Sequence, residues 1–75
     1  MKDLRTLREE IILALGSFAD NVKISLYEDK FYIVECPDCD GWSRFIKCGN
    51  LLAENKSLNA IGDGMYNCYY VEYKD

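Results

Sequence analysis

The sequence predicts a small two-layer α+β domain, in which one or two helices cover one face of an antiparallel sheet of three or four strands. Apolar residues recur every three or four positions near the N-terminus and every second position from Val22 onward. These are the periods of a helix and of a strand. Short connections between the predicted strands favour antiparallel pairing. The 75 residues contain no evident linker or repeat, so we expect one domain over 1–75.

The first element is predicted to be an amphipathic helix that begins after Asp3, because aspartate is a common helix N-cap. Its apolar residues follow one another at spacings of three and four, which places them on a single face. They are Leu4, Leu7, Ile11, Leu15 and Phe18. The helix is expected to end between Gly16 and Asp20.

A β-hairpin is predicted next, with strands over 22–27 and 31–36. Aliphatic residues alternate with other residues in the first strand, and the second is rich in aromatic and β-branched residues. The polar segment 28–30 between them is typical of a turn.

The second half of the chain is expected to add a third strand over 42–48, a helix over 50–61 and a last strand over 65–73. Gly49 and Asn50 would end the third strand and start the helix. The predicted order of elements is therefore α-β-β-β-α-β.

Four cysteines, Cys36, Cys39, Cys48 and Cys68, form the clearest candidate metal site. Four thiolates arranged as a tetrahedron suit one structural Zn²⁺. The segment Cys36-Pro37-Asp38-Cys39 resembles half of a zinc-ribbon knuckle, which implies a zinc-stapled domain. Ordinary buried thiols are the main alternative, because free cysteine packs as a small hydrophobic residue. Disulfides are another, in an oxidising compartment.

The same four residues, 36–39, resemble the Cys-Pro-x-Cys motif of glutaredoxin-like proteins. That resemblance implies a redox protein with a second proline facing the motif, and the chain has only Pro37. Catalysis is not expected either, because the chain has no histidine for a Ser-His-Asp or Cys-His arrangement.

The net charge of −4, from 13 acids and 9 bases, makes direct binding to nucleic acid or to an anionic membrane unfavourable. No apolar run is long enough for a membrane span. The first residues also lack the pattern of a signal peptide, so a cytoplasmic protein is expected. The charge suits a protein partner with a basic surface.

The acids gather between Glu28 and Asp40, where Lys30 is the only base. They are interpreted either as a patch that docks on a basic groove or as a solvated hairpin edge. The candidate partner-binding acids are Glu28, Asp29, Asp38 and Asp40.

Tyrosines fill the last predicted strand, and exposed tyrosine is a common interface anchor. The candidates are Tyr66, Tyr69, Tyr70 and Tyr73. They could instead fill both faces of the sheet, or join two copies of the chain as a homodimer. Base stacking is a further use of such a row, but no basic groove accompanies it.

The sequence therefore predicts a non-enzymatic, acidic protein-binding module or inhibitor, for example a virus-encoded antagonist of a host enzyme that handles nucleic acid. The alternative is a zinc-stapled domain that contacts nucleic acid or a nucleic-acid assembly through Trp42, Arg44 and Lys47.

Overall fold

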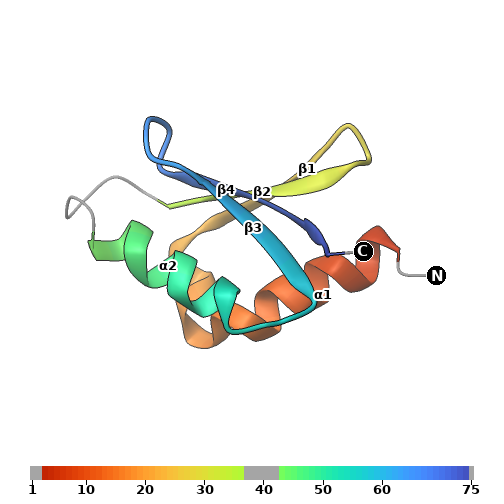
Figure 1. Cartoon of the computed structure of the whole chain (residues 1–75), viewed down its shortest axis with the longest axis horizontal. Helices are drawn as coiled ribbons and strands as arrows, with labels where there is room; N and C mark the ends of the chain where they lie inside the picture. Colours follow the sequence, from red (N-terminus) through yellow and green to blue (C-terminus); the bar gives the residue numbers. More distant parts are fainter. Residues whose placement is uncertain (1–2, 37–42, 75) are drawn as a thin grey trace.

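The computed structural model describes residues 3–36 and 43–74, which form two helices packed against one face of a four-stranded sheet (Figure 1). The elements follow the order α1 (Leu4–Leu15), a 3₁₀ turn (Gly16–Asn21), β1 (Lys23–Tyr27), β2 (Phe31–Glu35), α2 (Ser43–Ala53), β3 (Leu58–Asp63) and β4 (Cys68–Tyr73). The two-layer α+β class is confirmed. None of the described helices is long and apolar enough to cross a membrane.

The first half of the chain folds as its local sequence indicates. Asp3 caps α1, since its carboxylate accepts a hydrogen bond of 3.0 Å from the Thr6 backbone N–H. That bond is the main cause of the lowered pKa of Asp3. The predicted apolar face packs into the core through Leu7, Ile11 and Leu15. The β1–β2 hairpin also forms, with Tyr27 paired to Phe31 beside the turn.

The strand predicted over 42–48 and the helix predicted over 50–61 are wrong. Residues 43–53 form α2 instead, whose core side carries Cys48 and Leu52 at helical spacing. Residues 58–63 form β3. The observed order is therefore α-β-β-α-β-β.

A glycine explains part of this difference. Gly49 was expected to end a strand, but it lies inside α2. A Cβ added at this position would lie 2.8 Å from Cζ of Tyr69. The close approach of Tyr69 therefore accounts for a residue that is ordinarily unfavourable within a helix.

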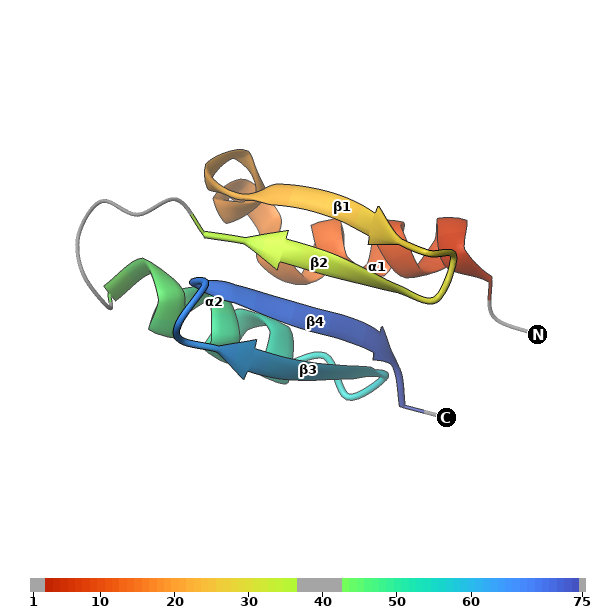
Figure 2. The same ribbon diagram turned by 90° about the horizontal axis from the view of Figure 1, so that it is seen from above.

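The sheet order is β1-β2-β4-β3, and every neighbouring pair is antiparallel (Figure 2). β2 and β3 consequently run in the same direction with β4 between them. The last strand is shorter than predicted, because residues 65–67 belong to the β3–β4 turn, where Asn67 has a φ of 52°.

The described elements form two α-β-β halves, although the sequence was expected to contain no repeat. The segment Tyr-x-Val-Glu occurs at 32–35 in β2 and again at 69–72 in β4, which are the two central strands. In both copies the tyrosine and the valine enter the core. The helices add the equivalent core pair Leu15 and Leu52, also 37 positions apart.

Candidate functional site

The face of the sheet that the helices leave open is the main candidate site (Figure 2). The register of the strands places an apolar row across its centre, since Ile33 pairs with Tyr70 and Tyr70 pairs with Ile61. Residues that pair across neighbouring strands lie on the same face. Ile61 has 56% of its surface exposed.

Two further aromatic residues extend this row. Tyr27 stacks on Phe31 with ring centroids 5.1 Å apart, and Phe31 and Tyr70 form a T-shaped pair with centroids 5.8 Å apart. These geometries are favourable for aromatic pairs. We call the resulting surface the open-face cluster, which consists of Tyr27, Phe31, Ile33, Ile61 and Tyr70.

Acidic residues border the open-face cluster at both ends. At one end, Glu35 and Asp63 both pair with Cys68 in neighbouring strands. Towards the other end, Glu72 pairs with Asn59. The tip of the β1–β2 hairpin adds Glu28 and Asp29, both exposed and both with positive φ.

Charge is distributed unevenly between the two layers. The hairpin segments 23–35 and 58–73 carry five acids and two bases, whereas α2 carries two bases and no acid. The α1 helix is balanced, with two of each. The open sheet is thus the acidic side of the described molecule, and α2 is the basic side.

Asp63 forms hydrogen bonds that fix one end of the open-face cluster. Its carboxylate accepts a hydrogen bond of 2.8 Å from the Tyr70 hydroxyl and one of 3.1 Å from the Met65 N–H. The bond to Asp63 is the main cause of the raised pKa of Tyr70. The ring of Tyr70 is therefore held in place on the open face, and the β3–β4 turn is fixed beside it.

The structure separates the predicted tyrosines into exposed and buried residues. Tyr66 is exposed in the β3–β4 turn, and Tyr70 lies on the open face. Tyr69 is buried, and its hydroxyl donates a 2.6 Å hydrogen bond to the Phe45 carbonyl. Burial raises the pKa of Tyr69 to about 12.

Tyr73 also packs against the core, and its hydroxyl donates to Oγ1 of Thr6 at 2.9 Å. Tyr69 and Tyr73 thus lie on the core side of the sheet, apart from the open-face cluster, and their role as partner-binding residues stays a prediction. Of the predicted acids, Asp38 and Asp40 lie outside the described residues.

The sequence reasoning missed four of the five residues of the open-face cluster, Tyr27, Phe31, Ile33 and Ile61. A signal for two of them exists in β2, where Phe31 and Ile33 alternate with Tyr32 and Val34. Both sets are apolar, so alternation alone does not reveal which set faces the helices.

The sheet divides the described cysteines. Cys36 and Cys48 lie in the core, and burial is the main cause of the raised pKa of both thiols. Cys68 lies on the other face between Glu35 and Asp63, and its pKa is also raised by burial. All three are free thiols.

No group of three metal-binding side chains forms within residues 3–36 and 43–74. Cys39 lies outside this part of the chain. The four-cysteine zinc site stays a prediction.

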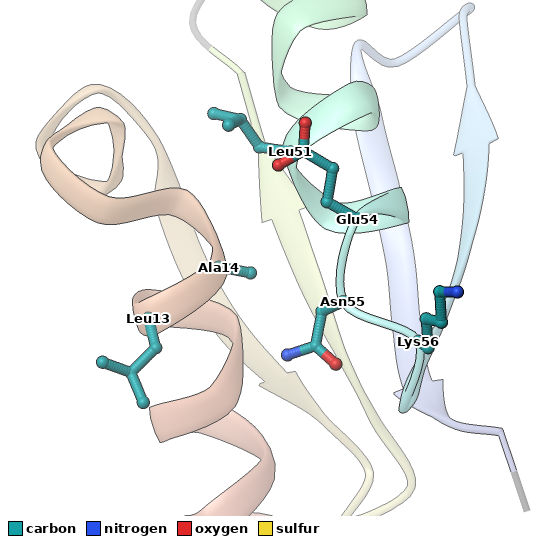
Figure 3. Close-up of a pocket in the computed structure, with 6 residues that line it drawn as sticks. All are labelled: Leu13, Ala14, Leu51, Glu54, Asn55 and Lys56. Atoms are coloured by element: carbon teal, nitrogen blue, oxygen red, sulfur yellow. The ribbon is translucent and has the colours of Figure 1, made fainter.

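An open groove of about 460 Å³ lies between α1 and the C-terminal end of α2 (Figure 3). Its lining mixes apolar and polar residues, and Asn55 in it donates a 2.8 Å hydrogen bond to Glu10. The lining residues are Leu13, Ala14, Leu51, Glu54, Asn55 and Lys56. Ala14 faces Asn55, whereas Leu13 and Lys56 point in different directions, so the groove gathers no set of reactive groups (Figure 3).

Comparisons with protein-family models, curated protein sequences and solved structures find no match to this chain.

Proposed function

We propose that this protein is a non-enzymatic binding module whose open sheet face docks on a protein partner with a basic surface. The observation that supports this most strongly is the open-face cluster. It places three aromatic and two aliphatic side chains on the one face that the helices leave uncovered. Contiguous exposed apolar surface commonly marks an interaction site.

The contacts within the cluster favour binding. Phe31 already packs against both Tyr27 and Tyr70, and the hydroxyl of Tyr70 is bonded to Asp63. Aromatic side chains that are held in this way lose little conformational entropy when a partner covers them. The cluster would form the dry centre of an interface.

The charges around the cluster favour one class of partner. Glu35 and Glu72 are exposed on the same face, and the hairpin tip adds two more acids. Lys23 pairs with Glu35 and Lys30 lies 3.9 Å from Glu28, so acids outnumber bases around the cluster but do not exclude them. This border attracts a surface rich in lysine and arginine, and speeds encounter with it. It repels the phosphates of nucleic acid, which makes the aromatic residues poor candidates for base stacking.

We further propose an inhibitory role, as an extension of this choice of partner. A basic protein surface that handles nucleic acid offers the charge that the open face would bind. A module seated on such a surface would compete with the nucleic acid. This extends the proposal from binding to antagonism of an enzyme or assembly that acts on nucleic acid.

The binding proposal is tested by Ile33→Glu, which places a charge at the centre of the cluster. The matched control is Leu13→Glu, which makes the same kind of change at a side chain 77% exposed on α1. Immobilised wild-type protein is expected to retain a set of basic proteins from lysate at low salt. We expect salt to weaken this retention, because exposed charges are screened.

Quantitative mass spectrometry of the retained proteins checks this prediction. Ile33→Glu should retain these proteins in amounts reduced by at least ~90%, which corresponds to a loss of about 1.4 kcal/mol or more in binding free energy. Leu13→Glu should retain them in wild-type amounts. Far-UV circular dichroism confirms that both variants are folded. Retention of the same proteins by Ile33→Glu and wild type would disprove the open face as the binding surface.

A further inference from the structure

One edge of the sheet remains open. β3 is the last strand in the sheet order and pairs only with β4, in a continuous register over six residues. Along its other side, β3 has no neighbouring strand in the part of the chain that the structure describes. Unpaired backbone N–H and C=O groups on such an edge can pair with an added strand.

The two edges of the sheet differ in how well they resist such an addition. β1, at the opposite edge, contains five residues and begins with Lys23, and a lysine on an edge strand discourages pairing. β3 contains no lysine, arginine or proline, and its only charged residue is Asp63. Its register with β4 also shows no bulge. The β3 edge is thus the less protected one, and its charge is negative.

We propose that β3 receives an extended, basic segment of the protein partner as a fifth, antiparallel strand. This inference rests on the proposed function and specifies how the partner is held. Antiparallel addition continues the pattern of the existing sheet. Backbone hydrogen bonds along the edge would provide affinity, and side chains at alternate positions would provide selectivity.

The negative charge of the protein favours a basic segment, rather than a second copy of the chain, as the added strand. Each copy carries a net charge of −4, so two copies repel one another. Asp63 uses one carboxylate oxygen for Met65 and the other for Tyr70. A carboxylate has about four acceptor positions, so it can still accept from an ammonium or guanidinium group.

The register of an antiparallel strand defines the side chains that the segment should carry. Asp63, Ile61 and Asn59 share the open face, since they pair with successive open-face positions of β4. The incoming strand would place a cation opposite Asp63, a β-branched residue opposite Ile61 and a polar residue opposite Asn59. In the direction of the added strand, the pattern is basic, any residue, aliphatic, any residue, polar.

The probe for this inference is the peptide acetyl-Lys-Thr-Val-Val-Thr-Val-amide, titrated into the ¹⁵N-labelled full chain. We expect chemical-shift changes centred on the backbone amides of β3 and weak binding, with a dissociation constant between about 0.1 and 5 mM. Replacing the peptide lysine with glutamate should weaken binding several-fold. In the variant Asp63→Asn this preference for lysine should largely disappear.

Two N-methylated peptides provide the decisive control. In an antiparallel pair, alternate residues direct their N–H groups towards the neighbouring strand. Methylation of one alternate set of amides should reduce binding at least tenfold, and methylation of the other set should leave it nearly unchanged. A side-chain-only contact would not distinguish the two sets.

The highest peptide concentration is about 5 mM, which equals the weakest dissociation constant expected. The inference is overturned if no β3 amide signal shifts at that concentration or if the shifts centre on the helices. It is also overturned if both methylated peptides bind equally well. The proposed function is judged separately by the Ile33→Glu capture experiment. Loss of capture without peptide binding would retain the open-face interface and remove strand addition. Peptide binding together with unchanged capture by Ile33→Glu would retain strand addition and remove the open-face interface.

Discussion

Replacing Leu52 with alanine is expected to destabilise the protein by about 2–5 kcal/mol, the usual range for removing a buried leucine side chain. Leu52 is fully buried, and it lies on the face of α2 that packs against the core. A domain of this kind has a total stability of about 5–15 kcal/mol. The variant should therefore lose a large part of the protein's total stability and unfold at a much lower urea concentration.

Urea unfolding followed by circular dichroism measures this effect. Leu13→Ala is the matched control, because the same substitution is made at an exposed position of the other helix. It should change stability by no more than about 0.5 kcal/mol. Similar unfolding midpoints for the two variants would contradict the packing of α2 on the sheet.

Gly49→Ala is expected to destabilise the protein by about 1–3 kcal/mol, because the added methyl group overpacks a filled site. An alanine Cβ at this position would lie 2.8 Å from Cζ of Tyr69 and closer still to its hydroxyl oxygen. In an uncrowded helix the same change would stabilise by about 1 kcal/mol. The sign of the measured effect therefore shows which of the two contributions is larger.

A double-mutant cycle with Tyr69→Phe isolates the contact. Removing the hydroxyl loses its 2.6 Å bond to the Phe45 carbonyl, at a cost of about 0.5–1.5 kcal/mol. It also removes the atom nearest to the added methyl group. Gly49→Ala should consequently cost less in the Tyr69→Phe background. The exposed helix change Asn50→Ala serves as the propensity control, and additive effects of Gly49→Ala and Tyr69→Phe would contradict the close contact.

The part of the fold that could be predicted from sequence is the part fixed by local signals. Asp3 and the apolar spacing after it determine α1, and the polar turn between two β-rich runs determines the first hairpin. These features depend on residues a few positions apart. Propensity and periodicity therefore suffice to find them.

The segment 42–63 was misassigned because its decisive contacts are distant in sequence. Gly49 is compatible with a helix interior because Tyr69 packs against it from β4, 20 positions later. The helical spacing of Cys48 and Leu52 was present, but Gly49 and Asn50 between them suggested a break. Tertiary packing overrode the local preference of the glycine.

The sequence predicted the kinds of residue in the candidate site better than it predicted which residues form it. Acidic charge and tyrosine were both expected, and Tyr70 and the hairpin acids do lie on or beside the open face. The reasoning could not decide between Tyr69 and Tyr70, because that depends on which face the helices cover. The repeated Tyr-x-Val-Glu segment aligns Tyr69 with Tyr32 and Val71 with Val34, so it indicates that these four residues share one face but not which face the helices cover.

The central claim is that a basic protein partner covers the open sheet face, and side-chain footprinting with hydroxyl radicals tests it most directly. The captured complex and the free protein are oxidised in parallel, and the modified residues are quantified by mass spectrometry. The account predicts that Tyr27, Phe31 and Tyr70 become protected in the complex, while Leu13 and Ile46 on the helices stay reactive. Protection of Leu13 and Ile46, with the three aromatic residues unchanged, would contradict it.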